Sequence, residues 1–284
     1  MRKKVVFITG ARGFIGRNLA EQFSRKYKLL TPGHKELDLL DEKAVGNYFK
    51  KNKIDTVINC AVIGGSRKEE HVESSLSGNL RIFFNILKNK SKFKKMIHLG
   101  SGAEYDKSEK IINVKELDFD RKIPQDEYGF FKYICSKYIQ NEKNIVCLRI
   151  FGLFGKFEDF RYRFISNAIV NNIKGLPITI NQNVFFDYLY INDFVKIVDY
   201  FIENKVKHMF YNLGTGNKID ILTIAKKINL ISQCRSEIKV KHTGLNNEYT
   251  CDNTRLKKEL KNFLFSDFDE SLKELYNWYR NNNE

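Results

Sequence analysis

The feature that most constrains the fold is a set of evenly spaced glycines near the N-terminus. Residues 5–9 (VVFIT) form a short, β-branched apolar run, and three glycines follow it directly: Gly10, Gly13 and Gly16. Residues 17–27 then place apolar side chains at helical spacing. This order predicts a strand, a tight turn and a helix.

Such a turn lets the backbone approach a pyrophosphate, whose charge is met by free N–H groups and the positive end of the helix dipole. We therefore expect the turn to bind a dinucleotide through Gly10, Arg12, Gly13, Phe14, Ile15 and Gly16. The alternative is a tight strand-to-helix turn that binds no ligand.

Charge near the second strand indicates which dinucleotide fits. A strand expected at about residues 27–31 leads into PGHKELDLLD. An NAD site would place an acidic residue there to hold the ribose 2′-hydroxyl, whereas this chain offers Gly33, His34 and Lys35. A 2′-phosphate would be attracted by His34, Lys35 and Arg12, so NADP(H) is favoured over NAD(H). The alternative is that Arg12 and Lys35 are ordinary surface charges.

A tyrosine and a lysine four residues apart follow about a hundred residues later, in DEYGFFKYICSKYI. Residues four apart share one face of a helix, so Tyr128 and Lys132 are expected to project together. A phenol, with a pKa of about 10, is a poor base at neutral pH, but a nearby cation favours its ionised form. Ser101 directly follows an apolar run, MIHLG, that predicts another strand. These three residues predict a catalytic centre at the carboxyl ends of the strands.

The glycine spacing and the Ser101, Tyr128 and Lys132 pattern resemble the extended short-chain dehydrogenase/reductase family of nucleotide-sugar enzymes, also called the NAD-dependent epimerase/dehydratase family. The resemblance implies that Ser101 binds the carbonyl oxygen, that Tyr128 protonates it, and that Lys132 holds the cofactor ribose. Segments such as LRIFGLFG (148–155) and FYNLGTG (210–216) extend the likeness over most of the chain. Residues 34–65 resemble the corresponding part of GDP-fucose synthase-like 4-ketoreductases.

Four further residues complete the expected cofactor site. Asp38 and Leu39 resemble the dipeptide that contacts adenine in this family. Ala61 ends the next apolar strand, and Asn79 lies on the helix expected after it. The family also implies a homodimer that pairs through two helices, one of them carrying Tyr128.

Departures from the family pattern narrow the expected reaction. Dehydratases carry Asp-Glu after the serine or threonine, where this chain has Gly102 and Ala103. GDP-fucose synthase uses a cysteine, whose place Ala103 takes, and a histidine, yet no histidine occurs between His98 and His208. A ketoreductase without epimerase activity is what remains.

The expected function is thus NADPH-dependent reduction of a keto group, implied by the resemblance to be at C4, of a nucleotide-diphosphate 4-keto-6-deoxy sugar for surface-polysaccharide synthesis. An NAD-dependent nucleotide-sugar 4-epimerase is the alternative, because it uses the same three residues. A non-enzymatic protein that senses NADP(H) stays open, since fold alone does not determine function. The intact Ser101, Tyr128 and Lys132 argue against that reading.

The substrate end departs from the family as well. Gly152 replaces an asparagine that often contacts the diphosphate, and Phe186 replaces a common arginine. The residues considered as substrate contacts instead are Arg149, Arg161, Arg163 and Tyr105. Each also has an ordinary interpretation, as a structural or solvated side chain.

The alternating strands and helices predict an α/β fold, a Rossmann-type doubly wound parallel sheet with a smaller C-terminal α/β substrate lobe. Residues 1–157 are expected to bind NADP, with a strand near 209–213 returning to that sheet. Residues 158–284 are expected to form mainly the nucleotide-sugar lobe, and substrate would lie in the cleft between them.

Composition excludes several other classes. The formal net charge is +15, but the lysines are spread along the chain, so no specific nucleic-acid partner is expected. The five cysteines are scattered without CxxC spacing, which predicts neither a metal site nor a disulfide framework. No apolar run reaches about 18 residues and no signal peptide is evident, so we expect a cytoplasmic protein without a membrane partner.

Overall fold

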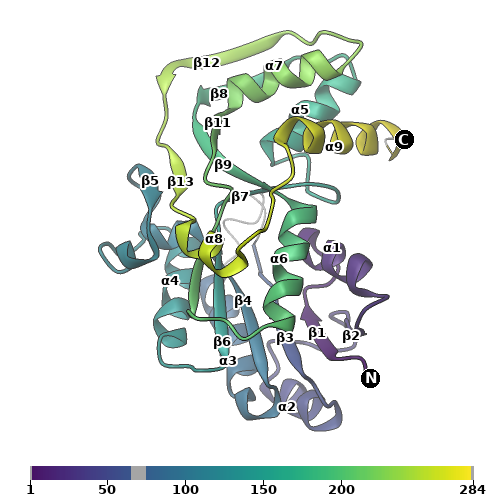
Figure 1. The fold of residues 1–284 in the computed structure, drawn as a ribbon, viewed down its shortest axis with the longest axis vertical. Coiled ribbons are helices and arrows are strands. Elements are labelled where there is room, and N and C mark those ends of the chain that lie inside the picture. Colours follow the sequence, from purple (N-terminus) through teal and green to yellow (C-terminus); the bar gives the residue numbers. More distant parts are fainter. Residues whose placement is uncertain (1, 65–74, 283–284) are drawn as a thin grey trace.

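A computed structural model describes residues 2–64 and 75–282. The lower part of the molecule in Figure 1 is a parallel six-stranded sheet with the order β10-β6-β4-β3-β1-β2. Its strands are β1 (Val5–Thr9), β2 (Lys28–Leu30), β3 (Thr56–Asn59), β4 (Lys95–Ser101), β6 (Ile145–Ile150) and β10 (Phe210–Leu213). Because β2 and β3 lie on opposite sides of β1, the strand order reverses there, and ligands bind beside such a reversal.

Helices cover both faces of this sheet. One face carries α2 (Glu42–Lys51), α3 (Ser75–Leu87) and α4 (Glu127–Ile139), and the other carries α1 (Phe14–Phe23) and α6 (Ile191–Glu203). Successive strand residues point to opposite faces of the sheet. Phe7 and Val57 therefore pack in the core under α2, α3 and α4. Val6, Ile8 and Ile58 pack in the core under α1 and α6. All five are buried, and the sheet forms the rigid base of the molecule.

A second lobe lies beyond the upper ends of β4 and β6 in Figure 1. Its sheet has the order β11-β9-β13-β5, with β7 also pairing β9. These strands are β5 (Ile111–Val114), β7 (Gly152–Phe154), β9 (Phe185–Tyr190), β11 (Lys218–Asp220) and β13 (Tyr249–Cys251). Two longer strands, β8 (Ile178–Asn183) and β12 (Ile238–Leu245), form a separate parallel pair.

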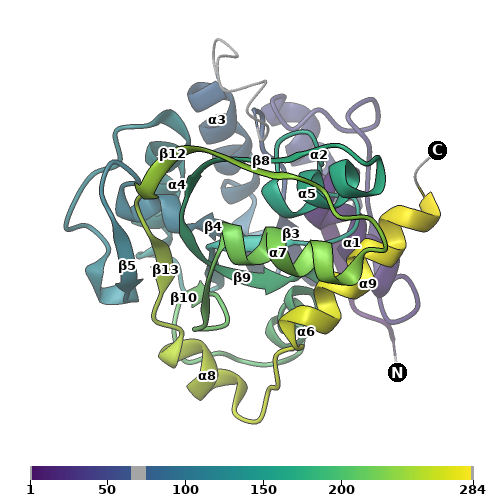
Figure 2. The same cartoon turned by 90° about the horizontal axis from the view of Figure 1, so that it is seen from above.

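The remaining helices pack in and beside this lobe. Viewed from above, α5 (Phe164–Ile173), α7 (Ile221–Ile231) and α9 (Phe268–Asn282) lie together, and α8 (Thr254–Leu260) lies apart, near β10 (Figure 2). Within residues 2–64 and 75–282, three short 3₁₀ helices complete the elements: η2 (Lys90–Lys92), η3 (Gly102–Tyr105) and η4 (Glu116–Asp118). No helix in the described part of the chain is long and apolar enough to cross a membrane.

The doubly wound α/β fold expected from the sequence is confirmed. The lobe sheet takes β5 and β7 from before residue 157, and the six-stranded sheet takes β10 from after it. A boundary at 157 between cofactor and substrate lobes therefore stays a proposal. The helical pattern read to Tyr27 ends at Phe23, and the Tyr27 ring packs edge-on against Phe23 from the turn beyond.

Candidate active site

The glycine turn closes tightly over the N-terminus of α1. Gly10 has a φ of 63°, in the left-handed region that glycine adopts without strain. A Cβ on Gly16 would overlap the carbonyl oxygen of Gly10, so only glycine allows this approach. Gly13 begins α1 without a side-chain cap, and no described group accepts the N–H of Phe14 or Ile15. The turn thus fits the phosphate cradle that the sequence predicts.

Cationic side chains lie where β2 ends. The Arg12 guanidinium packs against Gly33, since a Cβ at that glycine would come within 2.7 Å of an Arg12 nitrogen. His34 and Lys35 follow in an exposed turn. Two acids lie beside them: Glu36 accepts the Gly33 N–H at 2.6 Å, and an Asp38 oxygen lies 3.8 Å from the His34 ring nitrogen Nδ1. The preference of this site for NADP(H) over NAD(H) stays a prediction.

The Asn79 side chain binds the backbone of Ile63 through both ends of its amide. Its side-chain oxygen accepts the N–H of Ile63 and its amide donates to the Ile63 carbonyl, each at 2.8 Å. Both ends of the amide thus hold Ile63, just after β3, and cofactor contact by Asn79 stays a prediction, since the amide keeps a second N–H and a second lone pair. For Ala61, Asp38 and Leu39, cofactor contact stays a prediction.

The structure brings Ser101, Tyr128 and Lys132 to one place. Ser101 ends β4, and α4 lies beside that end with Asp126 capping it through the Gly129 N–H. The buried Lys132 donates to the carbonyl of Leu99, two residues before Ser101, at 2.5 Å. Its ammonium lies 5.7 Å from the centre of the Tyr128 ring. Tyr128 itself is 38% exposed, so its phenol can reach a ligand and solvent.

A buried carboxylate supports this centre from behind. Glu104 accepts the Ser101 N–H at 2.9 Å through one oxygen. Its other oxygen accepts from Ser136 on α4 and from Arg149 on β6, both at 2.6 Å. Both charged side chains are at most 1% exposed. Glu104 therefore ties the catalytic loop to the helix of Tyr128 and to the sheet. Sequence reasoning missed it, because nothing local marks a glutamate as buried.

Arg149 is not available to a substrate diphosphate. Besides Glu104, its guanidinium donates to the Tyr105 hydroxyl at 3.0 Å and stacks 4.2 Å from the Phe119 ring centre. Burial is the largest single influence and opposes its charge, but Glu104, Tyr105 and Cys147 together raise the pKa of Arg149. This corrects the expectation of a substrate contact. The Tyr105 hydroxyl is also engaged, since it donates to Asn212 at 2.7 Å, which leaves only its half-buried ring for a ligand.

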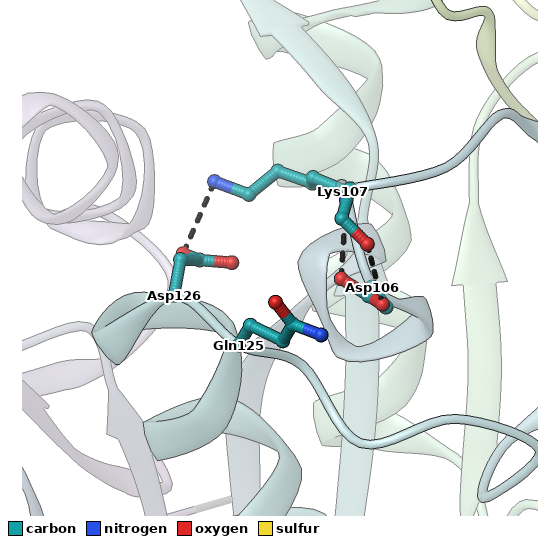
Figure 3. Close-up of a pocket in the computed structure, with 5 residues that line it drawn as sticks. Asp106, Lys107, Gln125 and Asp126 are labelled. Atoms are coloured by element: carbon teal, nitrogen blue, oxygen red, sulfur yellow. Dashed lines mark hydrogen bonds and ion pairs between the residues drawn. The ribbon is translucent and has the colours of Figure 1, made fainter.

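A hollow of about 460 Å³ opens beside the catalytic helix. Figure 3 shows its lining, with Lys107 reaching from one wall towards Asp126, 3.2 Å away, at the start of α4. The Lys107 ammonium also lies 5.8 Å from the centre of the Tyr128 ring. A second cation thus stands beside the candidate catalytic phenol.

The two arginines after residue 157 lie near the start of α5. Arg161 is exposed and forms a paired hydrogen bond with Asp159, at 2.9 and 2.8 Å. Arg163 is the residue before α5 and lies near Tyr188 and the buried Glu158. A substrate contact by either arginine stays a prediction. Among the residues described, no group of three or more His, Cys, Asp and Glu is arranged to hold a metal ion.

Glu158 gives a pH prediction. Burial raises its pKa from 4.5 to about 7, while Ser166 and Arg163 act in the opposite direction. A carboxyl whose pKa is raised by folding contributes stability below pH 4.5 that is lost by about pH 7. The unfolding free energy lost over this pH range is on the order of 3 kcal/mol. Glutamine cannot ionise, so Glu158→Gln should not lose it. The variant should therefore have a Tm several degrees above that of the wild type at pH 8, with no such gain at pH 4.5. Thermal unfolding from pH 4.5 to 8 measures it. The exposed Glu237→Gln is the control, and a parallel pH profile for wild type and Glu158→Gln would contradict the prediction.

Sequence similarity identifies the family of this chain. Residues 6–214 match the sequence model of the NAD dependent epimerase/dehydratase family. The chain belongs to that family. This confirms the resemblance and covers both the glycine turn and the Ser101, Tyr128 and Lys132 centre.

Individual members differ in reaction. The chain is 26% identical over 251 residues to a GDP-L-colitose synthase of Yersinia pseudotuberculosis, covering 78% of this chain and 80% of that protein. A GDP-6-OMe-4-keto-L-xylo-heptose reductase from C. jejuni has a similar structure, with a TM-score of 0.82, 18% identity and 99% of each chain covered. A UDP-glucose 4-epimerase of Thermotoga maritima is equally similar, with a TM-score of 0.84, 19% identity, and 99% and 100% covered. At these identities the structural likeness speaks for the fold alone.

Proposed function

We propose that this family member is an NADPH-dependent reductase of the 4-keto group of a nucleoside-diphosphate 4-keto-6-deoxy sugar. One observation carries the proposal: Ser101, Tyr128 and Lys132 lie together, and the two residues after Ser101, Gly102 and Ala103, bring no acid or thiol. Such a centre can reduce a carbonyl, and the two positions after Ser101 lack the Asp-Glu pair of the dehydratases and the cysteine of GDP-fucose synthase, which serve dehydration and epimerisation beside a ketone.

The residues present divide the work of reduction. NADPH, when bound, supplies the hydride that adds to the carbonyl carbon. Ser101 binds the carbonyl oxygen, and Tyr128 gives that oxygen its phenolic proton, so that C=O becomes CH–OH. Lys132 donates one of its three ammonium protons to the Leu99 carbonyl, which leaves the others to donate to the cofactor ribose and to the Tyr128 oxygen. Solvent returns the proton to the partly exposed Tyr128.

In the lobe expected to bind the substrate, aromatic rings are available to contact the sugar. The asparagine side chain that often contacts the diphosphate in this family is replaced by Gly152. A side chain at Gly152 is excluded, because a Cβ would lie 2.6 Å from the Asp187 carbonyl oxygen. Phe186 packs on Tyr188 at 5.3 Å and on Tyr249 at 5.9 Å between ring centres. Ring faces suit the apolar side of a deoxy sugar. Residues 158–284 would supply most of this lobe, with Arg161 and Arg163 as candidates for the diphosphate.

The test follows nicotinamide absorbance while purified protein, with NADPH or NADH, meets a panel of GDP-, CDP-, UDP- and dTDP-4-keto-6-deoxy sugars. Stoichiometric oxidation of NADPH by one of them would establish the reductase and name the nucleotide. Formation of a 4-epimer from an unoxidised nucleotide sugar, with no net oxidation, would replace the proposal with a 4-epimerase. Cofactor binding without either reaction would replace it with a sensor of NADP(H).

Arg12 carries the cofactor preference in this proposal. Arg12→Gln should raise KM for NADPH about tenfold or more and leave KM for NADH nearly unchanged, because a charged hydrogen bond to phosphate contributes about 1.5–3 kcal/mol. Steady-state kinetics with both cofactors measure the ratio. Arg25→Gln, an exposed arginine just after α1, is the matched control. Equal losses for the two cofactors would show that Arg12 does not read the 2′-phosphate.

A further inference from the structure

Lys107 brings a second positive charge to the candidate catalytic phenol. Its ammonium lies 5.8 Å from the centre of the Tyr128 ring, and that of Lys132 lies 5.7 Å from the same point. Lys132 is buried, whereas the side chain of Lys107 is 46% exposed. The two lysines also come from different segments, since Lys132 lies on α4 and Lys107 lies in the loop after η3. Two cations of separate origin therefore act on one phenol.

The backbone that carries Lys107 is fixed beside the catalytic loop. η3 follows Ser101 directly, and where it ends the N–H of Asp106 donates to the Ala103 carbonyl at 3.2 Å. Asp106 has a φ of 68°, which turns the chain. Its carboxylate accepts the N–H and the hydroxyl of Ser108, at 3.1 and 2.7 Å, so these bonds span Lys107. The turn thus sets the place of Lys107 relative to Ser101.

The Lys107 side chain reaches across the hollow to Asp126 (Figure 3). Its ammonium lies 3.2 Å from Asp126 Oδ1, and the same oxygen accepts the Gly129 N–H at 3.0 Å. The carboxylate therefore shares its charge with the positive end of α4, where a negative charge is favoured. Asp126 holds the lysine in place, and part of the lysine charge is left to act on Tyr128.

Reduction creates negative charge on this phenol. When the Tyr128 O–H bond breaks, the proton goes to the carbonyl oxygen, and the electron pair stays on the phenol oxygen and spreads into the ring. A cation within about 6 Å of an aromatic ring is attracted to its face, and an opposite charge at about 4–6 Å stabilises an ionised group. Charges that are already in place before the reaction need no reorganisation as the new charge develops. Lys107 and Lys132 both meet this condition.

We propose that Lys107 is a positioning residue that acts through Tyr128, its ammonium stabilising the phenolate that forms when Tyr128 protonates the substrate carbonyl oxygen. The proposal rests on the reductase function proposed above. It adds to Tyr128 and Lys132 a cation from the loop that follows Ser101. Solvent returns the proton to Tyr128 after the reaction, so the step needs no further reactant.

Single-turnover oxidation of NADPH, with the sugar that the panel identifies, tests this role. Lys107→Gln should lower the rate about three- to tenfold at low salt, because it removes a charge 5.8 Å from a partly exposed ring, while the Kd for NADPH stays unchanged. Lys107→Arg keeps the charge and should keep most of the rate. Lys110→Gln, at an exposed lysine further along the same loop, is the control for net charge. No loss in Lys107→Gln, or an equal loss in Lys107→Arg or Lys110→Gln, overturns the proposal.

Salt separates an effect of charge from a loss of packing. The screening length falls from about 10 Å at 0.1 M salt to about 3 Å at 1 M. The ratio of the wild-type rate to the Lys107→Gln rate should therefore shrink at least about twofold between these two conditions. A ratio that stays constant would mean that the lysine acts by packing, against the proposal.

Asp126→Asn separates the charge of Lys107 from its ion pair. Asparagine caps a helix as well as aspartate does, so α4 keeps its cap while the ion pair is lost. The single-turnover rate should not fall, because the charge of Lys107 is then unopposed. A loss equal to that of Lys107→Gln would show that the ion pair supports the centre, and not the charge on Tyr128.

The proposed function can fail separately from this role. Wild-type protein that oxidises no NADPH with any sugar of the panel overturns the reductase, and the role of Lys107 falls with it. Wild-type turnover at a rate that Lys107→Gln matches overturns the role of Lys107 alone.

Discussion

Tyr128→Phe is expected to fold, to bind NADPH as the wild type does, and to lose at least about a hundredfold in kcat. The variant keeps the ring on α4 and loses only the proton that the carbonyl oxygen needs as hydride arrives. Gly102 and Ala103, the residues that follow Ser101, carry no acid that could supply this proton instead. Single-turnover oxidation of NADPH with the substrate found in the panel measures the loss.

Tyr138→Phe is the matched control for that experiment. Tyr138 lies on the same helix and is 51% exposed, so removing its hydroxyl should change neither binding nor turnover. Fluorescence titration with NADPH checks that cofactor binding is intact in both variants. Near-normal turnover by Tyr128→Phe would remove this residue from the mechanism.

Glu104→Leu should destabilise the protein by about 3–5 kcal/mol, because it leaves the Arg149 guanidinium buried without its carboxylate. The guanidinium cannot escape by losing its proton. The Ser101 N–H and the Ser136 hydroxyl lose an acceptor in the same step. Urea unfolding monitored by circular dichroism measures the change in free energy.

The double variant Glu104→Leu/Arg149→Met separates stability from alignment. Methionine should pack among Phe119 and Phe210, whose ring centres lie 4.2 and 4.6 Å from the Arg149 guanidinium carbon, and most of the stability should return. Turnover should stay low, since Ser101 still lacks the bond that fixes its backbone. Full recovery of kcat would mean that Glu104 matters for stability alone.

The sequence predicted the parts of this protein that depend on local spacing. The glycine turn needs only its own residues and the strand and helix beside it, and Tyr128 and Lys132 share a helical face because they are four apart. The fold and the family were therefore within reach and are confirmed. The catalytic, cofactor and substrate roles of individual residues stay predictions, to be settled by the variants above.

Residues whose partners are distant in the chain were not predictable in the same way. Arg149 was considered for the substrate because a guanidinium can form paired charged hydrogen bonds with a diphosphate, yet it is buried against Glu104 and the ring of Phe119. Tyr249 gave no signal, since only the pairing of β13 with β5 and β9 brings its hydroxyl close to Gly102. The two hydrogen bonds of the Asn79 amide to the backbone of Ile63 were not foreseen either.

The interleaving of the two sheets has a consequence for synthesis of the chain. β6 does not acquire its outer neighbour β10 until residue 213, and β5 waits for β13 at residue 251. A nascent chain that has passed residue 157 therefore still exposes unpaired strand edges in both sheets, and such edges invite aggregation. Contacts between residues so far apart in the chain also slow folding. We infer that the protein reaches its native state late, as one cooperative unit, and that a fragment ending at 157 would be insoluble.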